Sequence, residues 1–197
     1  MKLLFRAFVC SFVICVLLSV SGFFGVCDEI RGDVFRLHII ANSDSEEDQN
    51  LKLMVRDEML RYSGELFKNC SGREESIITA RDHLPETEDH LNRFVKEQGY
   101  DYSVRAYVTD MDFDTRDYDG FTLPAGHYDA FRIVIGSGEG HNWWCVLYPA
   151  LCVTAAEPDR VNDAMSSGEA EIMTGGERYR FGFRIVELWE SFCSWFH

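Results

Sequence analysis

The chain opens on an unbroken apolar stretch. Residues 7–27 contain no charged side chain, while the basic Lys2 and Arg6 precede them and the acidic Asp28 and Glu29 follow. A basic start followed by an apolar run is typical of a signal peptide, and at about 1.5 Å of rise per residue the run spans roughly 30 Å, which also fits a permanent membrane anchor. Because positive charge stays on the cytoplasmic side, both interpretations place the rest of the chain across the cytoplasmic membrane. Membrane contact through residues 7–27 is expected if the segment is not cleaved.

A buried strand and two long helices are predicted next. Residues 34–42 form a compact apolar and β-branched run of the length of one strand. Ser45, three residues before Asp48, has the spacing of a helix N-cap, and apolar residues then recur every three or four positions as far as about Phe67. A second helical stripe covers residues 77–98, and Pro85 must kink or split it because proline lacks a backbone donor.

Strands are predicted in the second half of the exported part. Residues 102–109 alternate with a period of two, and residues 128–135 and 143–148 are two further predicted strands; an aspartate-rich loop and a glycine-rich turn separate the three. Because the helices come together and the later strands follow one another, the order βααβββ predicts an α+β fold with two helices on one face of a mainly antiparallel sheet. The predicted parts are an N-terminal signal peptide or anchor (1–27), an exported domain (28–156), a flexible acidic linker (157–177) and a C-terminal amphipathic helix (178–197).

The charge of the exported part is strongly negative. The whole chain carries 19 basic and 33 acidic residues, for a formal net charge of −14, and residues 1–27 contribute no acid to that balance. Nucleic-acid recognition depends on Lys and Arg neutralising phosphates, so nucleic acid is not an expected partner.

Four cysteines lie beyond the apolar segment and its border, in no spacing typical of zinc ligands. Cys145 and Cys152 are the candidate disulfide, which export permits. Buried free thiols remain the alternative, because residues seven apart pair only where the chain bends back between them.

The sequence offers two other kinds of chemistry. In a cysteine hydrolase, Cys145 would be the nucleophile and His127 or His141 its base, with Asn142 or Asp129 orienting the imidazole. Cys145 lies in the middle of a predicted strand, whereas an activated cysteine usually lies at a helix N-terminus or beside a cation. The other alternative is a weak cation site in the aspartate-rich loop, whose candidate ligands are Asp112, Asp114, Asp117 and Asp119. The competing explanation is an acidic loop exposed to solvent that binds no cation. No catalytic, metal or cofactor residue is therefore assigned.

Three blocks resemble a known family. They read RLHIIANSDSEEDQ at residues 36–49, PAGHYDA at 124–130 and IVIGSGEGHNWWCVLYP at 133–149. Together and in this order they closely resemble the stage II sporulation protein R family of endospore-forming bacteria, over about residues 34–153. His141 stands where the family pattern leads us to expect glutamine, and the acidic stretch after Cys152 is longer than expected.

This resemblance implies a signalling role and no enzymatic activity. Family members are made in the forespore, exported into the space between forespore and mother cell, and needed to activate a membrane-embedded aspartic protease. That protease then removes the pro-sequence of the mother-cell sigma factor E. The expected partner is therefore this protease, and no cofactor is expected.

The loops at one end of the predicted sheet are the candidate partner interface. The residues placed there are Asn42, Ser43, Asp44, Asp48, Gly126, His127, Tyr128, Asn142, Trp143 and Trp144. Structural roles are the competing explanation: Asn42 and Ser45 can cap a helix, the glycines can serve turns and the tryptophans can pack inside.

Overall fold

The computed structural model describes residues 2–151 and 158–194. They divide into two compact units, each built from separate stretches of the chain. The first, which we call the helical unit, comprises residues 2–31, 114–126 and 158–194. The second, the sheet unit, comprises residues 32–113 and 127–151.

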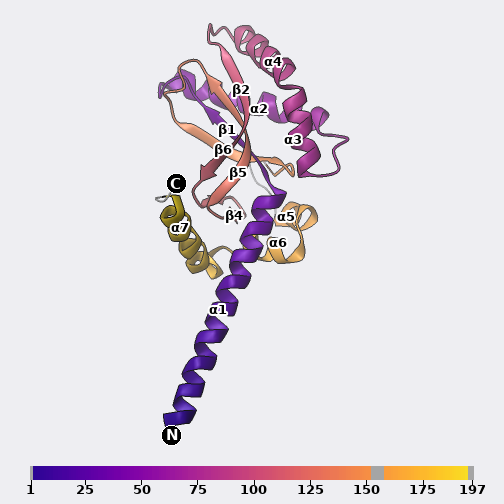
Figure 1. The fold of residues 1–197 in the computed structure, drawn as a ribbon. Coiled ribbons are helices and arrows are strands. Elements are labelled where there is room, and N and C mark those ends of the chain that lie inside the picture. The colour runs from indigo at the N-terminus through magenta and orange to yellow at the C-terminus, as the bar shows by residue number, and fades with distance from the viewer. Residues whose placement is uncertain (1, 152–157, 195–197) are drawn as a thin grey trace. The chain divides into compact units, whose positions relative to one another are not determined.

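A four-stranded sheet in the order β2-β5-β1-β6 organises the sheet unit (Figure 1). Its strands are β1 (Phe35–Ile40), β2 (Val104–Phe113), β5 (Gly126–Ile135) and β6 (Asn142–Tyr148). β1 pairs with β5 in parallel and with β6 antiparallel, so the sheet is mixed. All six residues of β1 are buried, as expected of a central strand covered on both faces.

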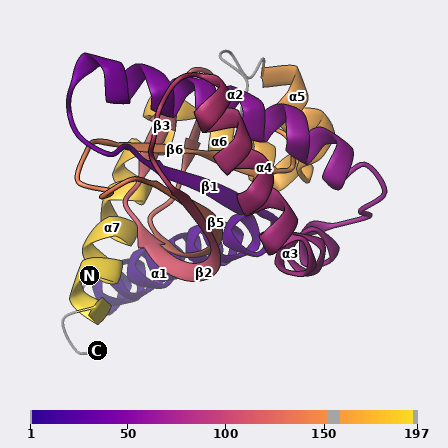
Figure 2. The same ribbon diagram turned by 90° about the horizontal axis from the view of Figure 1, so that it is seen from above.

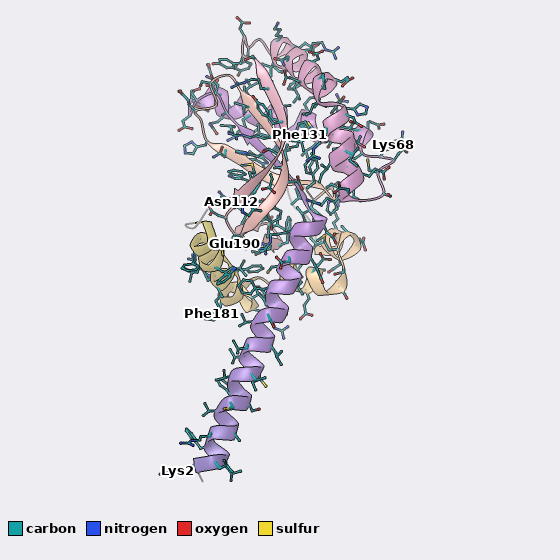
Figure 3. All side chains as sticks on the ribbon, in the orientation of Figure 1. Lys2, Lys68, Asp112, Phe131, Phe181 and Glu190 are labelled. Atoms are coloured by element: carbon teal, nitrogen blue, oxygen red, sulfur yellow. The ribbon has the colours of Figure 1, made fainter. Side chains whose placement is uncertain are left out.

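Three helices cover one face of the sheet (Figures 1 and 2): α2 (Glu46–Leu66), α3 (Arg73–Asp82) and α4 (Leu84–Glu97). Their buried apolar residues join alternate strand residues in one core, which contains Leu37 and Ile39 of β1. Phe131 of β5 also belongs to this core, and Figure 3 labels it. α2 begins where the sequence predicts, because the Ser45 side chain accepts a hydrogen bond from the backbone N–H of Asp48 at 3.2 Å. Pro85 lies in the first turn of α4, where its missing N–H costs nothing, so the predicted interruption separates α3 from α4.

Side chains of α4 protect the outer edge of β2. Asn92 exchanges two hydrogen bonds of 2.8 Å with the backbone of Val104, and the Glu88 carboxylate accepts the N–H of Ala106 at 2.9 Å. These contacts satisfy backbone groups that an edge strand would otherwise expose to pairing with another chain.

The helical unit begins with α1 (Lys2–Asp33), the one helix among the described residues that is long and apolar enough to cross a membrane. It also contains a two-stranded hairpin, β3 (Arg116–Tyr118) and β4 (Phe121–Leu123). The remaining elements are α5 (Pro158–Ala164), α6 (Ser167–Thr174), the 3-10 turn η1 (Gly176–Arg178) and α7 (Arg180–Ser194).

The α+β class and the C-terminal helix are as predicted. The sheet contains a parallel pairing of β1 with β5 beside the antiparallel pairing of β1 with β6, and the predicted aspartate-rich loop contains the β3-β4 hairpin. The described part of the predicted linker, 158–177, forms two helices that bury Val161, Ala170 and Met173. A capping box between Ser166 and Glu169 starts α6 and satisfies two backbone donors there.

Candidate functional site

Two loops of the sheet unit meet where the parallel strands β1 and β5 end. Asn42, just after β1, joins them: its Nδ2 donates to the Asp48 carboxylate at 2.8 Å, and its Oδ1 accepts the backbone N–H of Ser137 at 2.9 Å. The backbone carbonyls of Ala41 and Asn42 accept the N–H groups of Gly140 and Glu139 at 3.0 and 3.1 Å. We call residues 42–48 and 136–142 the loop pair.

Two glycines allow this close approach. A Cβ at Gly136, whose φ is +57°, would lie 2.3 Å from Asn42 Oδ1, and a Cβ at Gly140 would lie 2.2 Å from the carbonyl oxygen of Ser43. Neither distance is possible for real atoms, so any side chain at Gly140 must push the two backbones apart. The glycine-rich loop thus serves packing between the two sequence blocks, and a strand follows it in place of the helix that a phosphate loop would need.

Asp48 is the buried centre of the loop pair. Its carboxylate accepts hydrogen bonds from Asn42 Nδ2 and from the Ser43 hydroxyl at 2.5 Å, and Tyr102 also hydrogen-bonds to it. Burial acts to raise the pKa of Asp48, but these hydrogen bonds to the charged form outweigh it and hold the pKa below its ordinary value. The carboxylate is therefore an ionised structural acceptor at neutral pH.

Lys52 of α2 holds the second loop, residues 136–142, in place. Its Nζ donates to the His141 carbonyl at 3.0 Å and to the Gln49 side chain. Burial lowers the pKa of Lys52, against the opposing charge of Asp44. Asp44 accepts the backbone N–H of His141 at 2.6 Å and also contacts the His141 ring.

The rim of the loop pair is accessible. Asp44 and His141 side chains are 56% and 77% exposed, and Asn142 is exposed as well. Asn42, Ser43 and Asp48 lie beneath them and hold the two loops together. The loop pair can therefore present polar groups on a fixed backbone, which favours recognition of a partner.

Polar side chains also fill the sheet face opposite the helices. His38 of β1 is buried, donates from Nε2 to Asn142 Oδ1 at 2.9 Å and stacks on Trp144 with 3.8 Å between ring centroids. Burial, reinforced by the charges of Arg132 and Arg36 and opposed by the Asn142 hydrogen bond, lowers the pKa of His38 to about 4. His38 is thus neutral at physiological pH.

Arg36 is the largest fully buried side chain of this face. Its guanidinium carbon lies 3.9 Å from the centroid of the Phe113 ring and 4.9 Å from that of Tyr128. Such cation–π contacts compensate part of the cost of burying the charge. Arg36 and His38 are not among the residues predicted for the site. Both lie in a strand predicted to be buried, and polar residues at such positions are the signal that could have singled them out.

The tryptophans of the second block have separate roles. Trp144 stacks on His38 and makes a T-shaped contact with the Phe113 ring at 4.9 Å between centroids. Trp143 lies on the helix-covered side of the sheet, partly buried, with the Arg56 guanidinium 4.5 Å from its ring. Internal packing, the competing explanation for both residues, accounts for most of their contacts.

The Gly126-His127-Tyr128 segment does not join the loop pair. Because β1 and β5 run in parallel, with Arg36 opposite Ala130 and Ile40 opposite Val134, the start of β5 and the end of β1 lie at opposite ends of the sheet. The expectation that all candidate loops share one end was therefore wrong. His127 is exposed there, 3.3 and 3.2 Å from carboxylate oxygens of Asp110 and Asp112.

Cys145 does not have the environment of a nucleophile. It lies in β6 within the apolar core, is 3% exposed and carries a disulfide bond. A sulfur in a disulfide has no thiolate to attack with. Cys152, the predicted disulfide partner, lies outside the described residues. The cation alternative gains no support either, because the residues that the structure describes contain no group of three or more His, Cys, Asp or Glu arranged to hold a metal.

Comparison with known proteins adds the decisive observation. The family model described as Stage II sporulation protein R matches residues 31–158, which include all three sequence blocks. The chain belongs to the stage II sporulation protein R family.

A curated member agrees with this assignment. Stage II sporulation protein R of Bacillus subtilis (strain 168) is 37% identical over 123 residues, which cover 62% of this chain and 55% of that protein. The match thus spans about half the length of the relative. No solved structure matches the chain. Membership of the family gives the chain a sporulation role, and the loop pair lies inside the matched region.

Proposed function

We propose that this protein is an exported signal of endospore formation that activates a membrane-embedded aspartic protease, which then cleaves pro-sigma factor E in the mother cell. The single observation that carries the proposal is the family match over residues 31–158. The proposed site of action is the space between forespore and mother cell, as the resemblance to the family implies, and the protease is the proposed partner.

The architecture is compatible with export. α1 contains the uncharged residues 7–27, and its large apolar side chains from Leu3 to Leu18 are exposed. Such exposure is expected of a helix that lies in a membrane. The charge asymmetry around this segment supports an outward placement of the residues that follow it.

Activation requires a difference in affinity between two states of the partner. A ligand shifts an equilibrium only as far as it prefers one state, so this protein must bind the active protease more tightly than the inactive one. We assign the contact with the protease to the rim of the loop pair, because its polar groups are accessible and hydrogen bonds hold its backbone in place.

Rim variants test the assignment. Asp44→Asn keeps an acceptor for the His141 N–H but removes a charge, and His141→Ala removes the exposed ring. Asp112→Asn is the matched control, because its side chain is 62% exposed at the other end of the sheet. Pro-sigma factor E processing in sporulating cells should fall for the first two variants and stay normal for the control, with thermal stability unchanged in all three. Normal processing in both rim variants would remove the loop pair from the interface.

A further inference from the structure

Helix α7 carries an apolar stripe that is largely exposed to solvent. Phe181, Leu188 and Phe192 are 79%, 72% and 55% exposed. They follow one another at intervals of seven and four residues, so they lie on one side of the helix. Phe183 and Val186, on another side, are buried in the helical unit. Large exposed apolar surface of this kind marks a site of contact with lipid or another molecule.

α7 packs against the end of α1. The Phe23 ring stacks on Tyr179 at 6.0 Å and meets Phe183 edge-on at 5.4 Å, while Phe24 meets Trp189 edge-on at 6.5 Å. Gly182 makes the approach possible, because a Cβ there would lie 2.8 Å from the Phe23 ring.

An ion pair and the side-chain positions complete this arrangement. Arg31 of α1 lies 3.6 Å from the Glu190 carboxylate. In Figure 3, Phe181 lies at the end of α7 nearer the apolar half of α1, and Glu190 lies nearer the other end. The exposed stripe therefore begins beside the membrane segment.

The position of the α7 contact along α1 determines how deep this contact lies in the bilayer. Phe23 and Phe24 belong to the last turn and a half of the uncharged residues 7–27. If that run crosses the bilayer, these rings lie within about 6 Å of its outer end, at 1.5 Å per residue. An interfacial amphipathic helix buries its apolar side about 5–10 Å into the boundary between headgroups and acyl chains. α7 is attached to α1 at that level.

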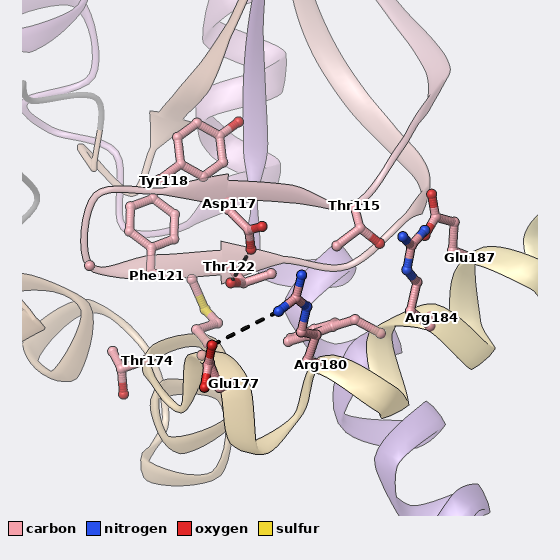
Figure 4. A pocket seen from close by; sticks show the side chains of 14 residues that line it. Thr115, Asp117, Tyr118, Phe121, Thr122, Thr174, Glu177, Arg180, Arg184 and Glu187 are labelled. Atoms are coloured by element: carbon pink, nitrogen blue, oxygen red, sulfur yellow. Dashed lines mark hydrogen bonds and ion pairs between the residues drawn. The ribbon is translucent and has the colours of Figure 1, made fainter.

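The two flanks of α7 differ in polarity. On the α1 side, a cavity of about 400 Å³ has an almost wholly apolar lining, which includes Val20, Phe23, Ile172, Phe181 and Ile185. On the other side, a cavity of about 630 Å³ faces the β3-β4 hairpin, and charged and hydroxyl groups line it together with Phe121, Met173 and Phe183 (Figure 4). Arg180, Arg184 and Glu187 of α7 belong to that polar cavity. The helix thus separates an apolar from a polar environment, as a helix at a membrane surface does.

We infer that α7 is an interfacial helix that lies on the outer leaflet beside α1, with its stripe among the acyl chains and one phospholipid chain in the apolar cavity. The exposed Arg178, Arg180 and Arg184 then lie at the level of the lipid phosphates. This inference rests on the outward placement of α1 in the proposed function. It also implies that cleavage after Ser21 would leave Phe23 and Phe24 on α7, so that a released domain would stay at the membrane surface.

Fluorescence quenching in liposomes tests the inference. The full chain is reconstituted into vesicles of phosphatidylcholine and phosphatidylglycerol whose acyl chains are brominated near the carbonyl end. The contribution of Trp189 is taken as the difference between the wild type and Trp189→Phe. Brominated lipid should quench this contribution, and the triple variant F181S/L188S/F192S should lose the quenching. Ile78→Ser, at an apolar side chain of α3 that is 49% exposed, is the matched control and should keep it.

Three results would overturn the inference. One is Trp189 emission that brominated lipid leaves unchanged, as expected if the stripe is a docking site for a protein and does not enter lipid. Another is equal quenching in the triple variant. The third is quenching that depends on the ratio of protein to lipid, which would assign the stripe to a second copy of the chain. The assay contains no protease or sigma factor. Protection of the N-terminus from external protease separately reports whether α1 is inserted, so failure of the outward placement and failure of the α7 assignment are distinguishable.

Discussion

Replacement of Asp48 by alanine is the sharpest perturbation of the loop pair. The change removes the acceptor of hydrogen bonds from Asn42, Ser43 and Tyr102 and leaves these donors in a partly buried site. A hydrogen bond to a charged group contributes about 1.5–3 kcal/mol, but three bonds to one carboxylate are not additive and water can reach part of the site. We therefore expect Asp48→Ala to lower the free energy of unfolding by about 3 kcal/mol.

The assay is urea unfolding of the full chain in detergent, followed by the emission of the tryptophans in the sheet unit. Asp57→Asn is the matched control, because the Asp57 side chain is 66% exposed and pairs with Arg56 at the surface. Such pairs contribute about 0–1 kcal/mol, so its midpoint should hardly move.

The pH dependence has a definite sign. The folded pKa of Asp48 is lowered, so its stabilisation is present above the unfolded pKa of about 3.9 and is lost as pH falls through the folded pKa. Asp48→Asn should weaken this acid-dependent loss. If the free energy of unfolding of Asp48→Ala equals that of Asp57→Asn, the claim that this carboxylate holds the two loops together is refuted.

Further predictions concern His38 and the glycines. The folded pKa of His38, about 4, lies below its unfolded value of about 6.5, so the unfolded chain binds more protons between these pH values. The free energy of unfolding should therefore fall by roughly 3 kcal/mol from pH 7 to pH 4. His38→Gln should reduce this dependence on pH, as measured by urea unfolding at each pH. Gly140→Ala should destabilise by about 2 kcal/mol or more, because its Cβ would meet the Ser43 carbonyl, whereas Gly64→Ala, in an open position of α2, should stabilise by about 0.5–1 kcal/mol. Cys145→Ser should reduce signalling only in step with lost folding, whereas a hydrolase would lose activity with its fold intact.

Features with local causes were predictable from the sequence. The start of α2 follows from the Ser45 cap, the separation of α3 and α4 from Pro85, and strand β2 from the alternation of residues 102–109. Each signal lies within a few residues of the element that it specifies, so no knowledge of the tertiary fold was needed.

Features that depend on distant partners were not predictable. The parallel pairing of β1 with β5 connects segments about ninety residues apart, and it alone decides that His127 lies away from the loop pair. Residues 158–177 have a polar composition, which predicted a linker. The helices in this segment are held in place by buried side chains such as Val161 and Met173, whose burial depends on the tertiary fold. The burial of Arg36 and His38 likewise depends on rings that come from β2, β5 and β6.

Reconstituted processing tests the central claim most directly. The protease and pro-sigma factor E are assembled in one membrane, and this protein is supplied from either side. We predict cleavage only when it is present on the face opposite the sigma factor, with activity reduced by Asp44→Asn and retained by Asp112→Asn. Cleavage at the same rate without the protein, or equal cleavage from both sides, would contradict its role as an exported activator.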